Sequence, residues 1–191
     1  PVHTVLLDGY YLDAHEVTNN AYAEFLNQSG DQTCQEQLCL DPEHTDVFFE
    51  NDVYLVPDEL AQNPATGITW FGAMAFCEWR DARLPTEAEW EKAAAWDEDG
   101  TNARRYPWGD DFDGQIVNFC DAACQEPQAN AEFNDGFAES APVASFGEGR
   151  SATGVYDMAG NVWEWVADWY DATYYQVSTK ENPTGPAGGE D

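Results

Sequence analysis

The sequence predicts an α+β domain that is rich in loops, with two or three helices and a few short strands. Its 191 residues suit a single domain. Helical periodicity of apolar residues is confined to three segments, all of which lie between residues 18 and 95. From Trp96 to Ala152, frequent Gly, Pro, Asn and Asp residues disfavour long regular elements.

Short strands are predicted in the first third of the chain. Thr4–Leu7 and Tyr10–Leu12 read as strands on either side of Asp8-Gly9, and Tyr54–Val56 reads as another. Residues 31–52 are a polar, acidic insertion, which we expect the first pair of cysteines to hold.

The first helix is predicted from Thr18 to about residue 28. Thr is a typical N-cap residue, and Ser29-Gly30 is a typical helix end. The apolar residues of this helix recur at i, i+3 and i+4 and form one stripe: Tyr22, Phe25 and Leu26.

Two further helices are predicted before the loop-rich region. One runs from about Phe71 to Arg80. The other begins at Thr86, which forms a capping box with Glu89: each side chain can bond the backbone N–H of the other residue. Its buried face would consist of Trp90, Ala93 and Ala94. Residues 57–64 are expected to be a loop, and the tail 181–191 is expected to be an exposed loop.

The charge is strongly acidic, with 7 Lys+Arg against 37 Asp+Glu and a net charge of −30. This balance excludes a nucleic-acid partner, because phosphates require a basic face. No apolar stretch approaches the roughly 18 residues of a transmembrane helix. Most carboxylates fit a solvated surface, and adaptation to high salt would use the same composition. Binding of hard cations is a third explanation, which needs a specific motif.

The five cysteines form two close pairs and one single residue. Cys34 and Cys39 are one pair, and Cys120 and Cys124 are the other. Neither pair has the two-residue spacing of a typical zinc ligand pair, so we favour disulfides and an extracellular or periplasmic location. Cys77 lies on a predicted helix and is either a buried free thiol or the partner of a cysteine outside this chain.

Six segments of the chain form recognisable motifs. In order they are His15-Glu16-Val17-Thr18-Asn19, Ile68-Thr69-Trp70 with Ala75-Phe76-Cys77-Glu78-Trp79, Arg83–Glu91, Tyr106-Pro107-Trp108-Gly109, Ala141-Pro142-Val143 and Gly154–Trp165. In this order they resemble the formylglycine-generating enzyme (sulfatase-modifying factor) family, whose domain is a variant of the C-type-lectin fold. The resemblance spans nearly the whole chain.

The resemblance implies two calcium sites. The first would use the Asn118 side chain, the Phe119 carbonyl, the Asp135 carboxylate and the Phe137 carbonyl. The second would use Asp157, the carbonyls of Gly160 and Val162, and Glu164. Each set mixes carboxylate or amide oxygens with loop carbonyls, which are the ligands that Ca²⁺ prefers.

The resemblance also implies a copper-dependent oxidase reaction that converts a substrate cysteine to formylglycine. In the family a pair of cysteines carries this reaction, after a strand resembling Arg-Gly-Gly-Ser. Residues 182–186 resemble the loop just before that strand, and none of the five cysteines matches the catalytic pair. We therefore expect residues 1–191 to be a single domain that lacks its C-terminal segment, with no catalytic or organic-cofactor residues of its own. In some members the cysteine matching Cys77 forms a disulfide with one in that segment.

Three functions follow as hypotheses. The favoured one is a secreted, calcium-stabilised, non-catalytic domain for binding or assembly. Its partner would be a protein or glycan, a second copy, or a C-terminal segment or separate chain that completes the fold. The alternative is a formylglycine-generating oxidase that acts on sulfatases, with copper held by cysteines of the missing segment. The third hypothesis, an iron-dependent sulfoxide synthase, is weaker. Such enzymes rely on a cluster of histidines, whereas His3, His15 and His44 are few and scattered.

Overall fold

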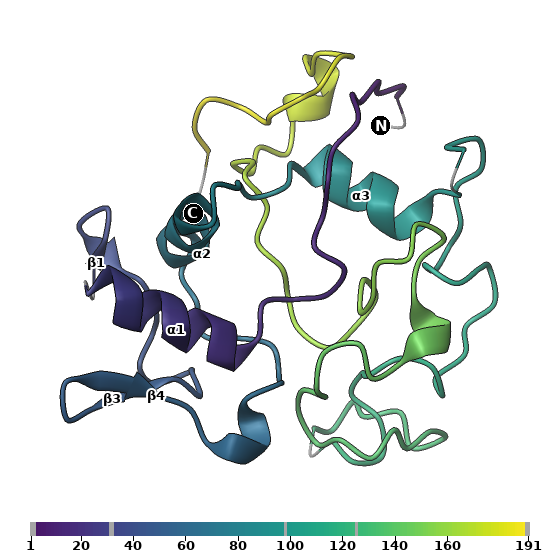
Figure 1. Cartoon of the computed structure of the whole chain (residues 1–191). Helices are drawn as coiled ribbons and strands as arrows, with labels where there is room; N and C mark the ends of the chain where they lie inside the picture. The colour runs from purple at the N-terminus through teal and green to yellow at the C-terminus, as the bar shows by residue number, and fades with distance from the viewer. Residues whose placement is uncertain (1–2, 31–32, 98, 125, 190–191) are drawn as a thin grey trace.

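A computed structural model describes residues 3–30, 33–97, 99–124 and 126–189. Three α-helices, two short hairpins and long loops make up this part of the chain, as predicted (Figure 1). The elements in order are α1 (Asn19–Ser29), β1 (Thr33–Cys34), β2 (Gln37–Leu38), β3 (Phe48–Glu50), β4 (Val53–Leu55), the 3₁₀ turn Asp58–Leu60, α2 (Trp70–Trp79), α3 (Glu87–Ala95), and the 3₁₀ turns Gly147–Gly149 and Tyr174–Gln176.

A threonine caps each of the three helices, at the predicted positions Thr18 and Thr86 and also at Thr69. Thr18 accepts a hydrogen bond from the backbone N–H of Ala21 at 3.2 Å and starts α1, while Thr69 does the same for α2. Gly30 ends α1 with a φ of 67°, in the left-handed region that favours glycine. These local signals explain why the predicted helix boundaries agree with the structure within about two residues.

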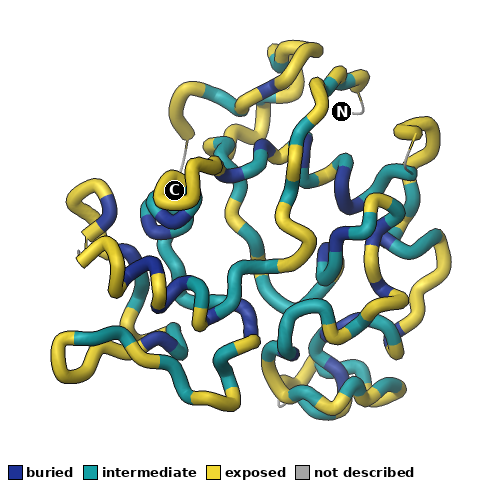
Figure 2. Tube along the Cα trace, in the orientation of Figure 1, coloured by how far each residue is buried: buried dark blue, intermediate teal, exposed yellow. Residues whose placement is uncertain are grey.

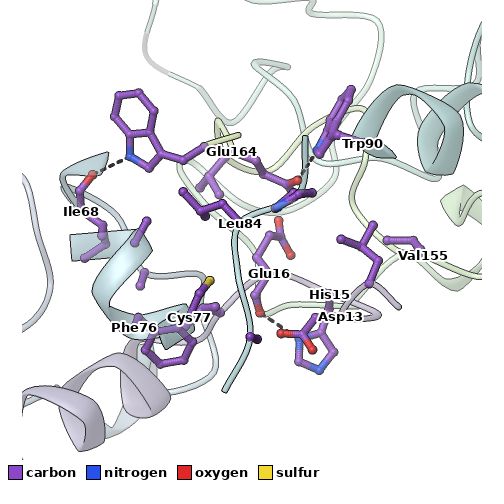
Figure 3. Close-up of a pocket in the computed structure, with 18 of the residues that line it drawn as sticks. Asp13, His15, Glu16, Ile68, Phe76, Cys77, Leu84, Trp90, Val155 and Glu164 are labelled. Carbon is purple, nitrogen blue, oxygen red and sulfur yellow. Dashed lines mark hydrogen bonds between the residues drawn. The ribbon is translucent and has the colours of Figure 1, made fainter. Parts of the chain in front are cut away.

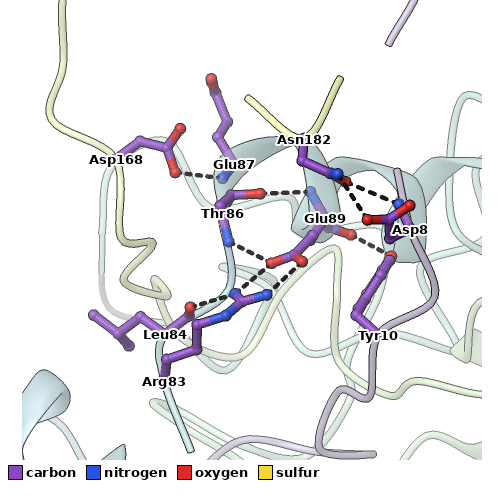
Figure 4. Close-up of polar contacts among 9 residues, drawn as sticks. All are labelled: Asp8, Tyr10, Arg83, Leu84, Thr86, Glu87, Glu89, Asp168 and Asn182. Carbon is purple, nitrogen blue, oxygen red and sulfur yellow. Dashed lines mark hydrogen bonds and ion pairs between the residues drawn. The ribbon is translucent and has the colours of Figure 1, made fainter. Parts of the chain in front are cut away.

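The N-terminus of α3 carries a dense polar network (Figure 4). The capping box is present: Thr86 Oγ1 accepts from the Glu89 N–H at 3.3 Å, and Glu89 accepts from the Thr86 N–H at 2.9 Å. The Glu89 carboxylate also accepts two bonds of 2.7 Å from the Arg83 guanidinium. One carboxylate thus fixes both the first turn of α3 and the chain that precedes it.

The predicted strands Thr4–Leu7 and Tyr10–Leu12 are wrong. Leu6 alone forms an isolated bridge, with Glu181, and no strand ladder forms at either segment in the described chain. The reason lies in the tail: it supplies a partner at one residue only, with the N–H of Leu6 donating to Lys180 at 2.7 Å. A single bridge leaves the rest of both segments unpaired.

The tail is less exposed than predicted. The Asn182 side chain bonds both the backbone N–H and the carboxylate of Asp8 at 2.9 Å, and Pro183 is buried (Figure 4). The tail therefore holds the N-terminal segment against the domain. Residues 190–191 of the predicted tail lie outside the described residues.

The acidic insertion folds into hairpins. A Cys34–Cys39 disulfide closes the β1–β2 hairpin, as the spacing predicted, while residues 31–32 lie outside the described part. The strand predicted at Tyr54–Val56 is β4, shifted by one residue, and it pairs with β3 in antiparallel register. β3 was not predicted, because its residues are all exposed and show no alternation of polar and apolar side chains.

The core consists of two separate clusters of buried side chains (Figure 2). The larger one joins α1, α2 and the hairpins around Tyr22, Leu26 and Phe76. Gly72 makes this packing possible, because a Cβ at this position would lie 1.9 Å from the carbonyl oxygen of Cys39. The smaller cluster joins α3 to the 155–158 loop. In the described residues, no helix is long and apolar enough to cross a membrane.

Candidate functional site

The first predicted calcium set is brought together by one carboxylate. Asp135 Oδ1 accepts from the N–H of Phe137 at 2.8 Å, and Oδ2 accepts from the N–H of Phe119 at 3.3 Å. Asn118 is buried and its Nδ2 donates to the carbonyl of Glu139 at 3.0 Å. All four residues of the set therefore belong to one folded loop region, although they span residues 118–137.

A buried residue that the sequence did not single out positions Asp135. Asp121 is 0% exposed, and its carboxylate accepts from the backbone N–H groups of Ala123 and Asp135. It follows Cys120, whose disulfide with Cys124 is formed as predicted. The disulfide and the Asp121 carboxylate together hold the loop that carries the first set.

The second predicted set lies on the loop after the smaller core cluster. Asp157 has a φ of 61°, its carbonyl accepts from the N–H of Gly160 at 3.1 Å, and its Oδ2 accepts from the N–H of Ala144 at 2.7 Å. Glu164 accepts a hydrogen bond from the indole Nε1 of Trp90 on α3. Burial, together with the charge of Asp157, raises the pKa of Glu164.

Glu16 is a third carboxylate at the second set, and the sequence reasoning missed it. Its Oε1 accepts from Asn161 Nδ2 at 3.0 Å, while its Oε2 is fully buried and has no hydrogen-bond partner. Burial and then the neighbouring carboxylates of Asp157 and Glu164 raise the pKa of Glu16 to about 8. Three acidic groups thus share a poorly solvated region with no basic side chain paired to any of them among the described residues.

The chemistry of both sets fits a hard cation. No described hydrogen bond ends on the four proposed backbone ligands, the carbonyls of Phe119, Phe137, Gly160 and Val162. The buried, unpartnered Glu16 oxygen lies beside the carboxylates of Asp157 and Glu164, and a cation there would balance the negative charge of this acidic group. No three His, Cys, Asp or Glu side chains in the described ranges are arranged to hold a metal ion by themselves. Backbone carbonyls and water would therefore have to complete either set.

A pocket of about 230 Å³ lies between the two core clusters (Figure 3). Its wall is mainly apolar, and Glu16 and Glu164 point toward each other inside it. Two aromatic side chains in its lining are fully exposed: the relative exposure of Tyr11 is 105% and that of Trp163 is 101%. An open apolar pocket with solvated aromatic side chains is typical of a binding surface.

Cys77 on α2 also lines the pocket. It is a half-buried free thiol, and burial raises its pKa. The other four cysteines are paired, so no second free thiol from this chain accompanies it. The wall of the pocket therefore contains one free thiol.

Among the described residues, the three histidines do not cluster, and the tyrosines near the C-terminus are partly exposed. Tyr170 and Tyr175 are 69% and 41% exposed, whereas Tyr174 is half-buried. His15 bonds the carbonyl of Glu16, His44 pairs with Asp41, and His3 contacts the ring of Tyr175. Each histidine has a different partner, as the scattered positions suggested.

The fold and these sites define the class: a loop-rich domain with the C-type-lectin-like fold. A family model described as "Sulfatase-modifying factor enzyme 1-like domain" matches residues 1–189. The chain therefore belongs to the sulfatase-modifying factor (formylglycine-generating enzyme) family, as the six motifs predicted.

Three relatives illustrate the range of proteins that contain this domain. "Serine/threonine-protein kinase pkn1" of Chlamydia caviae is 34% identical over 194 residues, which are 99% of this chain but 28% of that protein. "Formylglycine-generating enzyme" of Streptomyces coelicolor is 33% identical over 216 residues, which cover 99% of this chain and 67% of that protein. "Hercynine oxygenase" of Mycolicibacterium thermoresistibile is 32% identical over 183 residues, which cover 87% of this chain and 37% of that protein. This chain thus spans little more than a quarter of the Chlamydia protein.

Proposed function

We propose that this chain is a secreted, calcium-stabilised and non-catalytic domain for binding or assembly. The observation that carries the proposal is the open pocket with the fully exposed Tyr11 and Trp163. Burying a large aromatic side chain contributes roughly 1.5–3 kcal/mol. A partner that covered both side chains would gain this contribution at each of them.

The occupant that the pocket fits best is a polypeptide segment that completes the fold, from the same protein or from another chain. The apolar wall suits packed side chains, and Cys77 offers a thiol to a cysteine of such a segment. A glycan is less suited to a wall whose surface is mainly apolar.

Calcium would stabilise the loops around this pocket. Asn118, Asp135 and the carbonyls of Phe119 and Phe137 would hold one ion. Asp157, Glu164 and the carbonyls of Gly160 and Val162 would hold the other. Calcium supplies no redox chemistry here: it would cross-link loop segments that contain few regular hydrogen-bonded elements. The two disulfides support an oxidising, extracellular or periplasmic location.

Copper chemistry does not fit the residues of this chain. Cu(I) prefers thiolate ligands, and Cys77 is the single cysteine outside a disulfide. The second candidate function is therefore a copper-dependent oxidase of sulfatase cysteines whose thiol pair lies outside residues 1–191. The 33% identity to the Streptomyces coelicolor enzyme, over 67% of its length, favours this alternative.

Aromatic footprinting tests the binding proposal. The indole of Trp163 and the phenol of Tyr11 should be modified rapidly in the isolated 191-residue chain and be protected in the protein as it is naturally secreted. Tyr170, which is 69% exposed and outside the pocket lining, is the internal control and should react in both samples. Equal reactivity of Trp163 in both would contradict the proposed occupant.

Calorimetric calcium titration tests the metal sites. Asp135→Asn and Asp157→Asn should each lose one of two binding events, because each removes a charged ligand from one set. Asp58→Asn is the matched control, since Asp58 is exposed and belongs to neither set. If both site variants bind calcium like the wild type, the assignment is wrong.

A further inference from the structure

We propose that Asn161 couples the two calcium sets, so that filling one set raises the affinity of the other. The inference rests on the calcium sites of the proposed function and adds a residue that belongs to neither ligand set. Its basis is a direct contact between the two loops at this residue.

The backbone of Asn161 joins the sets. Its N–H donates to the carbonyl of Asn118 at 3.0 Å. The side chain of Asn118 belongs to the first set, whereas Asn161 lies between Gly160 and Val162, which supply the carbonyls of the second. One hydrogen bond therefore separates a ligand residue of the first set from the ligand loop of the second.

Gly160 shows how closely the loops approach each other. A Cβ at this position would lie 2.1 Å from the Asn118 carbonyl oxygen and 2.8 Å from a methyl group of Val117. These distances leave no room for a side chain between the loops. A shift of one backbone must therefore displace the other, as mechanical coupling requires.

The side chain of Asn161 fixes this contact in place. Its Oδ1 accepts from the N–H of Ala141 at 2.9 Å, and its Nδ2 donates to the Ala141 carbonyl at 3.3 Å and to Glu16 Oε1 at 3.0 Å. The residue has a φ of 64°, which asparagine tolerates better than most residues. Asn161 thus ties Ala141 and Glu16 to the junction between the two sets.

The shared contact gives the coupling a physical cause. Calcium in either set requires its loop carbonyls to be held in a binding arrangement, and that ordering has an entropic cost. Once one ion orders the Asn118–Asn161 contact, the second ion finds its loop already ordered. Couplings of this kind typically change affinity by roughly 5- to 150-fold.

A mutant cycle tests the coupling. Asp135→Asn removes a ligand from the first set, and calorimetry then measures the calcium affinity of the second. In the wild-type background, we expect Asp135→Asn to lower the calcium affinity of the second set at least about 5-fold. In the Asn161→Gly background, the same substitution should lower this affinity less than about 2-fold, because the coupling is reduced. Glycine retains the left-handed backbone and removes only the side chain. Asn51→Gly, at an exposed turn with a φ of 53°, is the matched control and should preserve the wild-type response.

The outcomes separate this inference from the calcium sites themselves. An equal loss of affinity from Asp135→Asn in both backgrounds would overturn the assignment of the coupling to Asn161, and no loss in either background would overturn the coupling itself. Both results would leave two calcium sites in place. A wild type that binds no calcium would refute the proposed function together with the coupling. If Asn161→Gly does not fold, amide exchange in Glu164→Gln replaces it. Calcium in the first set should then protect the Asn161 N–H, and unchanged exchange would overturn the coupling.

Discussion

Replacing Glu89 by Ala should destabilise the domain by about 2 kcal/mol. The side chain is 10% exposed and makes two kinds of contact at the start of α3. The capping bond to the Thr86 N–H is worth about 1 kcal/mol. The two bonds from Arg83 add about 1 kcal/mol, because the Arg83 side chain is 63% exposed and solvent screens the pair. At 2–4 °C per kcal/mol, the melting temperature should fall by roughly 4–8 °C.

Thermal and urea unfolding at neutral pH measure this loss. Glu91→Ala is the matched control on the same helix: Glu91 is exposed, so its replacement should change stability by less than about 0.5 kcal/mol. Hydrogen bonding from Arg83 lowers the pKa of Glu89. Its contribution is therefore present above the unfolded-state pKa of about 4.3 and is lost as the pH falls through the lower folded value. A loss below 0.5 kcal/mol at neutral pH would refute this account of the α3 N-terminus.

Three further perturbations test other parts of the structure. At about pH 9, above the pKa of about 8 that Glu16 has in the folded protein, Glu16→Gln should raise the melting temperature of the calcium-free protein, because it removes a buried charge beside Asp157. The same variant should weaken calcium binding, and the opposite signs in scanning calorimetry would contradict this role. Gly72→Ala should lower the free energy of unfolding by about 3 kcal/mol or prevent folding, since the added Cβ would lie 1.9 Å from the Cys39 carbonyl oxygen. A urea midpoint equal to that of the wild type would argue against this packing. At pH 7.5, Cys77 should react with iodoacetamide more slowly than free cysteine, and its rate should increase as the pH rises, because its pKa is raised. A rate equal to that of free cysteine would contradict the half-buried position of this thiol.

Local signals account for the parts of the fold that the sequence predicts. The N-cap residues Thr18, Thr69 and Thr86 begin the helices, and short spacings predict both disulfides. These features depend on neighbours within a few residues. By contrast, the bridge between Leu6 and Glu181 joins residues from opposite ends of the chain, so the local pattern wrongly predicted a strand there.

The candidate site, like the fold, is only partly predictable from the sequence. The resemblance to the family predicts Asp135, Asp157 and Glu164 as calcium ligands, whereas Glu16 and Asn161 gain their proposed roles from contacts across the fold. Both lie inside motifs that were recognised, which is the one sequence signal that could have drawn attention to them. Their contacts with each other depend on a separation of 145 residues, which no local spacing rule encodes.

The most direct test of a calcium-stabilised domain is scanning calorimetry of the purified chain with calcium or with chelator. Calcium at 100 times its dissociation constant would stabilise the folded state by about 2.7 kcal/mol per site. Two sites would therefore raise the melting temperature by roughly 10–20 °C for a domain of this size. Equal melting temperatures in saturating calcium and in chelator would contradict the central claim.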